Sequence, residues 1–227
     1  MQIAIDGPAG AGKSTIAKEL AKRLGFVYID TGAMYRAVTY LAVKRNISCE
    51  DGPGLARLAA EADFRLVPSG SGKQLIICEG EDITEAIREP LISQNVSLVS
   101  SHREVRRELV RKQRAMASGR NVVMDGRDVG TVVLPEAECK IFLTATLEER
   151  ARRRYEEMVG KGYAGDYDSV KKELARRDGL DENREVDPLR PAPDSVIIDT
   201  TGVRQEAVVK HILKICEEKR GKNRGEK

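Results

Sequence analysis

Hydrophobic and polar positions follow two different periods along this chain, and together they predict a mixed α/β protein. Short apolar runs of strand length occupy residues 1–6, 26–29, 121–125, 139–143 and 195–199. Between them, for example in residues 16–24 and 33–45, apolar side chains recur every three or four positions, which is the helical period. Buried strands that alternate with helices are typical of a parallel sheet covered by helices. We therefore expect a core of five parallel strands.

The middle of the chain departs from this progression. Residues 64–68 and 73–78 have the composition of strands, and the Ser/Gly-rich residues 69–72 between them indicate a hairpin. Three further segments complete this region: a loop at 51–54, a short helix at 55–62 and a turn at 79–82. Because hairpins do not belong inside a parallel βαβ progression, we expect a small insertion over about 46–92. The core of the single domain would then comprise about 1–45, 93–150 and 190–217.

Charge is concentrated in a few segments of the chain. The 39 Lys and Arg residues are balanced by 36 Asp and Glu residues, and the net charge of +3 is too small to indicate nucleic acid. Residues 93–118 have the pattern of one long helix, in which six basic side chains accompany a partial apolar stripe. Because no aromatic residues are interleaved with them, we expect most of these charges to be solvated and predict no nucleic-acid partner.

The most specific motif follows the first predicted strand. Gly7, Gly12, Lys13 and Ser14 fit the spacing G-x-x-x-x-G-K-[ST] of a phosphate-binding loop, in the required order of strand, loop and helix. Glycines let backbone N–H groups face an anion, and the helix N-terminus adds positive potential. Lys13 would contact the outer phosphates of a nucleoside triphosphate, and Ser14 would hold the accompanying Mg²⁺. The predicted triphosphate-binding residues are Gly7, Pro8, Ala9, Gly10, Ala11, Gly12, Lys13, Ser14 and Thr15.

Two later segments have the chemistry of a second phosphate site. Thr31 and Arg36 stand at the start of a predicted helix, where a polar loop and a guanidinium can hold a phosphate. A capping Thr with a solvated Arg is the alternative interpretation. Asp125, Arg127 and Asp128 follow a buried strand, so either aspartate could serve the metal while Arg127 binds a phosphate. The alternative here is a turn whose charges pair with one another.

Two arginine-rich segments near the C-terminal end indicate a lid. A capping box at 146–149 opens a predicted helix at 148–159, and a break at 160–167 separates it from a second helix at 168–177. Arginines that close over a transferring phosphoryl group stabilise its charge and exclude water. We therefore expect a lid over about 151–189, with a charged helical hairpin as the alternative.

Several classes of protein are disfavoured. Cys49, Cys78, Cys139 and Cys216 form no C-x-x-C pair and the two histidines stand alone, so we expect neither a zinc site nor a disulfide framework. The absence of a charged leader and of a long apolar run favours a cytoplasmic protein without membrane contact. The Lys/Arg-rich residues 218–227 are expected to form a disordered tail.

Four segments together resemble the bacterial cytidylate kinase family of nucleoside monophosphate kinases: residues 7–15, 30–36, 125–133 and 177–189. Many ATPases share the first segment, whereas the second and third in combination are far more selective, and the resemblance covers the chain short of its tail. It implies a P-loop nucleoside triphosphatase fold with a five-stranded parallel sheet, a monophosphate-binding insertion and a helical lid. It also implies transfer of the γ-phosphoryl group of ATP, with Mg²⁺, to CMP or dCMP, and we expect a monomer.

The same resemblance assigns roles by position. The monophosphate nucleotide would be contacted by Thr31, Arg36, Ser97, Arg106, Arg127 and Asp128. Of these, Arg36 and Arg127 would take its phosphate, and the cytosine edge would be read by Ser97, Arg106 and Asp128. The sugar would be held by Arg177 and Asp181. The catalytic residues would be Lys13, Arg127, Arg184 and Arg153. Thr31 stands where the family often has Ser, a change that preserves the hydroxyl.

Two alternatives remain open. A kinase for UMP or AMP would use the same phosphate loop, because one hydrogen-bonding edge selects the base. A P-loop switch or a nucleic-acid-dependent ATPase would use the basic helix, although the chain has no N-K-x-D segment to read guanine.

Overall fold

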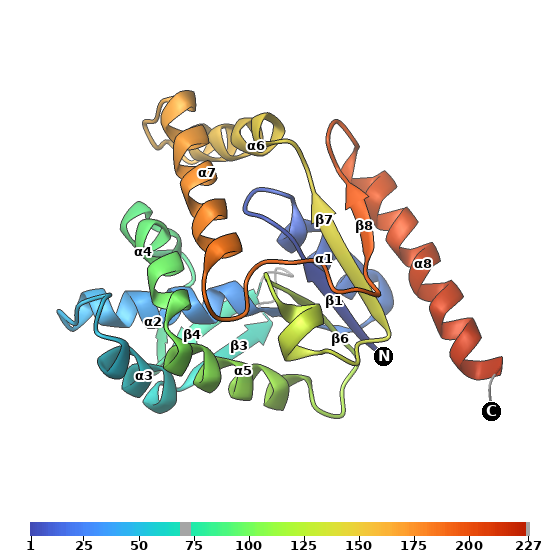
Figure 1. Ribbon diagram of the computed structural model, residues 1–227, viewed down its shortest axis with the longest axis horizontal. Coiled ribbons are helices and arrows are strands. Elements are labelled where there is room, and N and C mark those ends of the chain that lie inside the picture. The colour runs from blue at the N-terminus through green and yellow to red at the C-terminus, as the bar shows by residue number, and fades with distance from the viewer. Residues whose placement is uncertain (69–73, 226–227) are drawn as a thin grey trace. The chain divides into compact units, whose positions relative to one another are not determined.

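The computed structural model describes residues 1–68 and 74–225, which form two compact units. The first unit comprises Met1–Tyr28 and Ala117–Lys227, and the second comprises Ile29–Met116, so the boundary falls within β2 (Val27–Asp30). The other elements of the first unit (Figure 1) are β1 (Gln2–Asp6), α1 (Lys13–Leu24), β6 (Val122–Asp125), a π-helical turn η2 (Val129–Val133), β7 (Cys139–Thr144), α6 (Leu147–Gly160), α7 (Tyr167–Asn183), β8 (Val196–Asp199) and α8 (Gln205–Gly225).

The first unit is built on a parallel sheet with the strand order β2-β6-β1-β7-β8. The central strand β1 pairs in parallel with β6 and β7, and β7 pairs in parallel with β8. Ile3, Ala4 and Ile5 of β1 are fully buried, as expected for a strand covered on both faces. The predicted five-stranded parallel sheet is thus confirmed. Because β1 and β6 run in the same direction, their carboxyl ends reach the same edge of the sheet.

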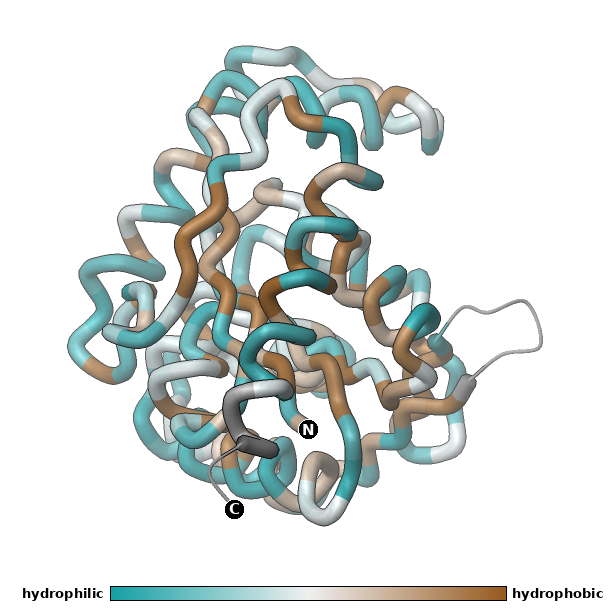
Figure 2. Tube along the Cα trace, turned by 90° about the vertical axis from the view of Figure 1, so that its right-hand side faces the viewer, coloured by the Kyte–Doolittle hydropathy of each residue, from teal (hydrophilic) through white to brown (hydrophobic). Residues whose placement is uncertain are grey.

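Helices α1 and α8 cover this sheet with their apolar faces. Ile16 and Leu20 of α1 and Val208 and Ile212 of α8 are buried in one cluster with the strands. In Figure 2 the helical turns alternate between hydrophilic teal and hydrophobic brown, as expected for helices with one buried face. The phosphate-loop motif is therefore followed by the amphipathic helix that its sequence predicted.

The C-terminal helix departs from the sequence-based expectation. We predicted that it ends near residue 217 and that a disordered tail follows, whereas α8 continues to Gly225. Its Cys216 and the Cys139 thiol of β7 are both buried, with their Sγ atoms 2.8 Å apart. All four cysteines carry free thiols. The contact between Cys216 and Cys139 therefore links α8 to the sheet as a thiol–thiol hydrogen bond.

Helices α6 and α7 pack against each other as a helical hairpin, which was the alternative to a lid in this region (Figure 1). Ala151 of α6 packs against Val170 and Leu174 of α7. The rings of Tyr155 and Tyr167 meet edge to face with their centroids 6.2 Å apart. This apolar contact between the two helices gives the hairpin a small core of its own.

The start of α6 agrees with its local sequence signal, whereas the end of α7 does not. Thr146 caps α6 as predicted, because its Oγ1 accepts a hydrogen bond from the Glu149 N–H at 3.3 Å. Helix α7 was predicted to end at Arg177 but runs to Asn183. As a result Arg177 and Asp181 stand one turn apart on the same helix.

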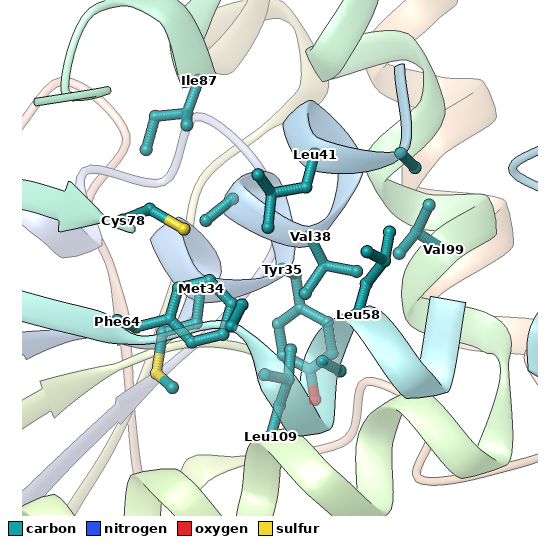
Figure 3. Packing of buried hydrophobic residues seen from close by; sticks show 14 of the residues in the cluster. Met34, Tyr35, Val38, Leu41, Leu58, Phe64, Cys78, Ile87, Val99 and Leu109 are labelled. Atoms are coloured by element: carbon teal, nitrogen blue, oxygen red, sulfur yellow. The ribbon is translucent and has the colours of Figure 1, made fainter. Parts of the chain in front are cut away.

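The second unit contains α2 (Thr31–Lys44), α3 (Gly52–Glu61), β3 (Phe64–Pro68), β4 (Gln74–Cys78), β5 (Glu81–Asp82), a 3₁₀ turn η1 (Ala86–Arg88), α4 (Pro90–Ser101) and α5 (Arg103–Ala117). The predicted hairpin is confirmed as antiparallel β3 and β4, although its predicted link at 69–72 lies outside the described residues. Glu81–Asp82 adds a short third strand where we predicted a turn. Figure 3 shows the core that this unit buries, with the labelled side chains of Met34, Tyr35, Val38, Leu41, Leu58, Phe64, Cys78, Ile87, Val99 and Leu109.

The predicted long helix at 93–118 is two helices, α4 and α5, separated at His102. His102 has extended backbone angles, with φ −71° and ψ 121°, and its Nε2 lies 2.9 Å from the Cys49 carbonyl oxygen. The hydroxyls of Ser100 and Ser101 donate back to carbonyl oxygens of the preceding turn, which competes with continuation of the helix. No Gly or Pro marks this break, so the hydrophobic period alone could not reveal it.

The two compact units also divide the chain differently from the predicted insertion at 46–92. The second unit includes α2, α4 and α5 together with the hairpin. The loop predicted at 51–54 is largely the first turn of α3, where the Asp51 carboxylate caps the helix by accepting the Gly54 N–H at 3.0 Å.

Among the residues that the structure describes, none of the helices is long and apolar enough to cross a membrane.

Candidate active site

The loop between β1 and α1 has the backbone that phosphate binding requires. Gly7, Gly10 and Gly12 adopt φ values of 144°, 77° and 88°, which side-chain-bearing residues rarely adopt. A Cβ on Gly7 would lie 1.9 Å from the carbonyl oxygen of Leu143 in β7. Helix α1 then begins at Lys13 without a side-chain cap, so its first N–H groups and its dipole are directed at the loop.

We expect Gly7→Ala to destabilise the fold by at least about 3 kcal/mol, because backbone strain and a clash with β7 act together. Gly25→Ala is the matched control: Gly25 also has a positive φ, of 66°, but no atom lies within 4 Å of its added Cβ. That control should lose only about 1 kcal/mol. Urea denaturation of both variants measures the difference, and equal losses would contradict the role given to Leu143.

Lys13 lies within the loop and is almost completely buried. Its Nζ donates a hydrogen bond to the Pro8 carbonyl oxygen at 2.7 Å, which folds the side chain back along the loop. Burial and then the positive charge of Arg127 lower the pKa of Lys13 well below its usual value. An anion bound in the loop would offset both effects, so the charge arrangement favours phosphate.

Ser14 and Asp125 meet at the edge where β1 and β6 end. The Ser14 hydroxyl donates to Asp125 Oδ2 at 2.8 Å, and the Tyr28 hydroxyl donates to Oδ1 of the same carboxylate at 2.8 Å. A hydroxyl beside a buried carboxylate offers the oxygen ligands that Mg²⁺ prefers. The described residues contain no group of three His, Cys, Asp or Glu side chains that could hold a metal. This donor set suits an ion that takes its remaining ligands from phosphate and water.

The two aspartates that the sequence left undecided have different partners. Asp125 contacts Ser14, as above, whereas Asp128 forms an ion pair with Arg184 Nη2 at 3.5 Å. Arg184 Nε in turn donates to the Asp187 carbonyl oxygen at 2.6 Å. Because its carboxylate is hydrogen-bonded to the proposed magnesium ligand of the phosphate loop, Asp125 is the better placed aspartate for a metal.

Arg127 is held by α7. Its Nε donates to Asp181 Oδ2 of α7 at 2.8 Å. Burial acts to lower the pKa of Arg127, but the surrounding carboxylates, Asp181 first, together raise it. The charges of 125–128 are therefore not simply paired within one turn, since Arg127 pairs with Asp181 and Asp128 pairs with Arg184.

Arg177 adds a further buried positive charge to this group. Burial, followed by the nearby charge of Arg127, lowers its pKa to about 10. Its Nε has no hydrogen-bond partner among the described residues. Lys13, Arg127 and Arg177 thus influence one another within the first unit, and an anion among them would stabilise all three.

Arg153 lies beside the phosphate loop but is engaged with the end of β8. Its Nη1 and Nη2 donate to the Thr200 hydroxyl and carbonyl oxygen at 3.0 Å and 2.6 Å. Its Nη1 would be 3.9 Å from a Cβ on Gly12. Whereas Arg127 and Arg184 pair with aspartates, Arg153 donates from Nε to Glu149 of its own helix at 2.9 Å.

Arg150 was not among the predicted site residues, but it contacts the phosphate-loop motif through the Ala9 carbonyl oxygen. Arg150 donates to the carbonyl oxygens of Ala9 and Ala145 at 3.1 Å and 3.0 Å and to Asp178 Oδ2 at 2.5 Å. It is buried in spite of its charge. Its partners lie up to 141 residues away, so no local pattern could distinguish it from the solvated arginines that follow it.

In the second unit, Arg36 is not the solvated arginine of the alternative interpretation. Its Nη1 donates to the Ser93 hydroxyl at 2.8 Å and to the Ile87 carbonyl oxygen at 3.3 Å. The cap of α2 is Asp30, which accepts the Ala33 N–H at 2.9 Å, and not the neighbouring Thr31.

Two candidate base-reading residues of this unit are also buried. Ser97 lies within α4, and Arg106 of α5 is only 1% exposed. Arg106 donates to the Ser100 carbonyl oxygen at 3.3 Å, and its guanidinium lies 5.6 Å from the ring centroid of Tyr35. Our expectation of a solvated basic helix is thus wrong for Arg106, because the aromatic ring and the carbonyl compensate its burial. No sequence pattern indicated that Tyr35 would contact Arg106 or that Ser93 would contact Arg36.

Comparisons with known proteins identify the family of this chain. A cytidylate kinase family model matches residues 3–218. A curated cytidylate kinase of Carboxydothermus hydrogenoformans is 53% identical over 95% of this chain and 96% of its own length, and one of Geobacillus kaustophilus is 52% identical over 97% and 98%. A crystal structure of an uncharacterized protein from Eubacterium ventriosum covers 96% of this chain and 98% of its own at 14% identity, with a TM-score of 0.54, which supports the fold alone. The chain belongs to the cytidylate kinase family.

Proposed function

We propose that this protein transfers the γ-phosphoryl group of ATP to CMP or dCMP, giving CDP or dCDP and ADP. The observation that carries this proposal is the arrangement of Arg127. This arginine follows the strand next to the phosphate loop, is held by Asp181 of the lid and lowers the pKa of Lys13. A second phosphate-binding group so close to the loop is what a phosphoryl acceptor needs, whereas a simple ATP-binding switch does not need it.

The donor nucleotide is assigned to the phosphate loop. The N–H groups of residues 7–15 and the dipole of α1 would surround its phosphates, and Lys13 would contact the outer ones. Ser14 and Asp125 would hold Mg²⁺, the second of them through a direct or water-mediated contact. The ion would supply positive charge that offsets the negative charge of the phosphates.

The acceptor nucleotide is assigned to the residues that the family resemblance indicates. Its phosphate would bind Arg36 and Arg127, with Thr31 nearby, and the cytosine edge would be read by Ser97, Arg106 and Asp128. The sugar would be held by Arg177 and Asp181. Burial of Ser97, Arg106 and Asp128 supports this assignment, because hydrogen bonds discriminate most strongly between bases where water is excluded.

The chemical step needs little proton transfer. An oxygen of the acceptor phosphate is already an anion, so it attacks the γ-phosphorus as the bond to the β,γ-bridging oxygen breaks and ADP leaves with that electron pair. The protein's contribution is to bring two negatively charged groups in line and to neutralise them. Lys13, Arg127, Arg184 and Arg153 are proposed for that role.

The direct test is ADP formation from ATP and Mg²⁺ with CMP, dCMP, UMP or AMP as acceptor. We expect kcat/KM for CMP and dCMP to exceed that for AMP by at least about 100-fold, because the wrong base would leave buried polar groups unpaired. Comparable use of UMP or AMP would move the assignment to another monophosphate kinase. Turnover that no monophosphate stimulates would contradict the proposal. A cytoplasmic location and a monomeric state stay predictions, and gel filtration checks the second.

Arg36→Gln tests the acceptor side in the second unit. We expect KM for CMP to rise about 10- to 100-fold, because a charge-assisted contact to phosphate is lost, while KM for ATP changes less than about 3-fold. The matched control is Arg45→Gln at the other end of α2, where Arg45 pairs with Glu79 in an exposed ion pair. If the two variants have the same KM for CMP, Arg36 does not bind the acceptor.

A further inference from the structure

The last two residues of β1 hold the segment that carries Arg127 and Asp128. The Ile5 carbonyl oxygen accepts the Gly126 N–H at 3.0 Å. The Asp6 carboxylate accepts two hydrogen bonds, one at Oδ1 from the Val129 N–H at 2.8 Å and one at Oδ2 from the Gly130 N–H at 2.7 Å. Residues 126–130 are therefore fastened to β1 at both ends.

The carboxylate acts as a helix cap from a distant strand. Val129 and Gly130 open the π-helical turn η2, and the first N–H groups of a helical turn have no partner within it. The residue before the turn, Asp128, makes no capping hydrogen bond with its own side chain. Asp6 accepts those N–H groups instead, which leaves the Asp128 carboxylate to pair with Arg184.

Burying the Asp6 carboxylate costs free energy, which indicates that the position of the segment matters. Asp6 is 4% exposed, and burial raises its pKa to about 7 in spite of the two N–H bonds. A Cβ on Gly130 would lie 3.3 Å from Asp6 Oδ2, so the small residue permits the close approach. A buried acid and a glycine thus occur together where Arg127 and Asp128 leave the sheet.

We propose that Asp6 is a positioning residue for the phosphoryl acceptor: it fixes the backbone of Arg127 and Asp128 and thereby governs the use of CMP. This inference rests on the proposed function, in which Arg127 and Asp128 contact CMP. Asp6 also precedes Gly7 directly, so one residue of β1 joins the donor loop to the acceptor segment. Its side chain hydrogen-bonds to η2, and its charge is the smallest of the named influences on the pKa of Lys13, so the main effect of the side chain falls on the acceptor.

Asp6→Asn and Gly130→Ala test the inference from the two sides of the contact. The amide of Asn has one acceptor oxygen and places an N–H₂ group against the other N–H donor. The methyl group that Gly130→Ala introduces would press on Asp6 Oδ2 at 3.3 Å and would also contact the Lys140 side chain at 3.4 Å. We expect KM for CMP to rise at least about 10-fold in both variants and the preference for CMP over UMP to fall. The dissociation constant for ATP, measured by calorimetry, should change less than about 3-fold.

Asp194→Asn is the matched control, since Asp194 pairs with Lys140 in the same unit but is largely exposed. An unchanged KM for CMP in Asp6→Asn, or an equal loss of ATP affinity, would overturn the inference. If Asp6→Asn does not fold, Gly130→Ala decides in the same way, because it retains the carboxylate. A wild-type protein that uses no monophosphate would instead contradict the proposed function. Faster hydrogen exchange at the Val129 and Gly130 amides in Asp6→Asn tests the contact itself, independently of the substrate.

Discussion

Lys13→Ala is expected to lower kcat/KM for phosphoryl transfer by at least about 1,000-fold, the largest effect of any single side chain in the donor loop. In the proposed function the ammonium group is the positive charge that the loop itself supplies to the outer phosphates, and it lies in a buried site where charges interact strongly. The assay is ADP formation with CMP at saturating Mg²⁺. Lys22→Ala, at an exposed position in the last turn of α1, is the control and should behave as the wild type.

Stability separates this catalytic effect from a folding defect. Burial and the charge of Arg127 disfavour the charged form of Lys13, so removing the charge should not destabilise the nucleotide-free protein. Lys13→Met keeps most of the side-chain volume and should unfold at the same temperature as the wild type or higher. Near-normal turnover in either variant would contradict the assignment of the loop.

The strand, loop and helix of the phosphate-loop motif could be predicted because their determinants are local. The positive φ values of Gly7, Gly10 and Gly12, the strand before them and the amphipathic helix after them are all encoded within about two dozen residues. The helical hairpin of α6 and α7 was predictable for the same reason, through the Thr146 cap and the arginine-rich helices, whereas its role as a lid stays a prediction. The spacing of residues in the sequence determines these features, so they can be predicted without knowledge of tertiary contacts.

The residues that support the site could not be predicted because their contacts are distant in sequence. Tyr28 reaches Asp125 across 97 residues, and Asp6 reaches Val129 across 123. A tyrosine within a short strand or an aspartate before a glycine carries no signal of such a partner. The prediction that Arg106 is solvated was wrong for a related reason. Its helical neighbours are basic and exposed, and the contact with Tyr35 of another helix explains its burial.

Arg127→Ala is expected to lower kcat/KM for CMP by about 1,000-fold while KM for ATP changes little. The guanidinium is the proposed ligand of the acceptor phosphate, and its loss also leaves the carboxylate of Asp181 buried without its partner. Burial acts to raise the pKa of Asp181, and Arg127 and Arg177 at present hold it below its ordinary value. We therefore expect Arg127→Ala to destabilise the fold by about 3 kcal/mol as well.

The acceptor role and the structural role of Arg127 can be separated by Asp181→Asn and by the double variant. If Arg127 acts mainly by holding the lid, Asp181→Asn should lower kcat/KM for CMP as much as Arg127→Ala does, and the double variant should be no worse. If Arg127 contacts the phosphate, Arg127→Ala should lose at least about 10-fold more than Asp181→Asn, and Arg127→Lys should recover part of the loss because it retains the charge. Arg152→Ala, on the exposed face of α6, provides the control for removal of a lid arginine. A fall in ATP affinity as large as the fall in CMP affinity would place Arg127 at the donor nucleotide and contradict the acceptor assignment.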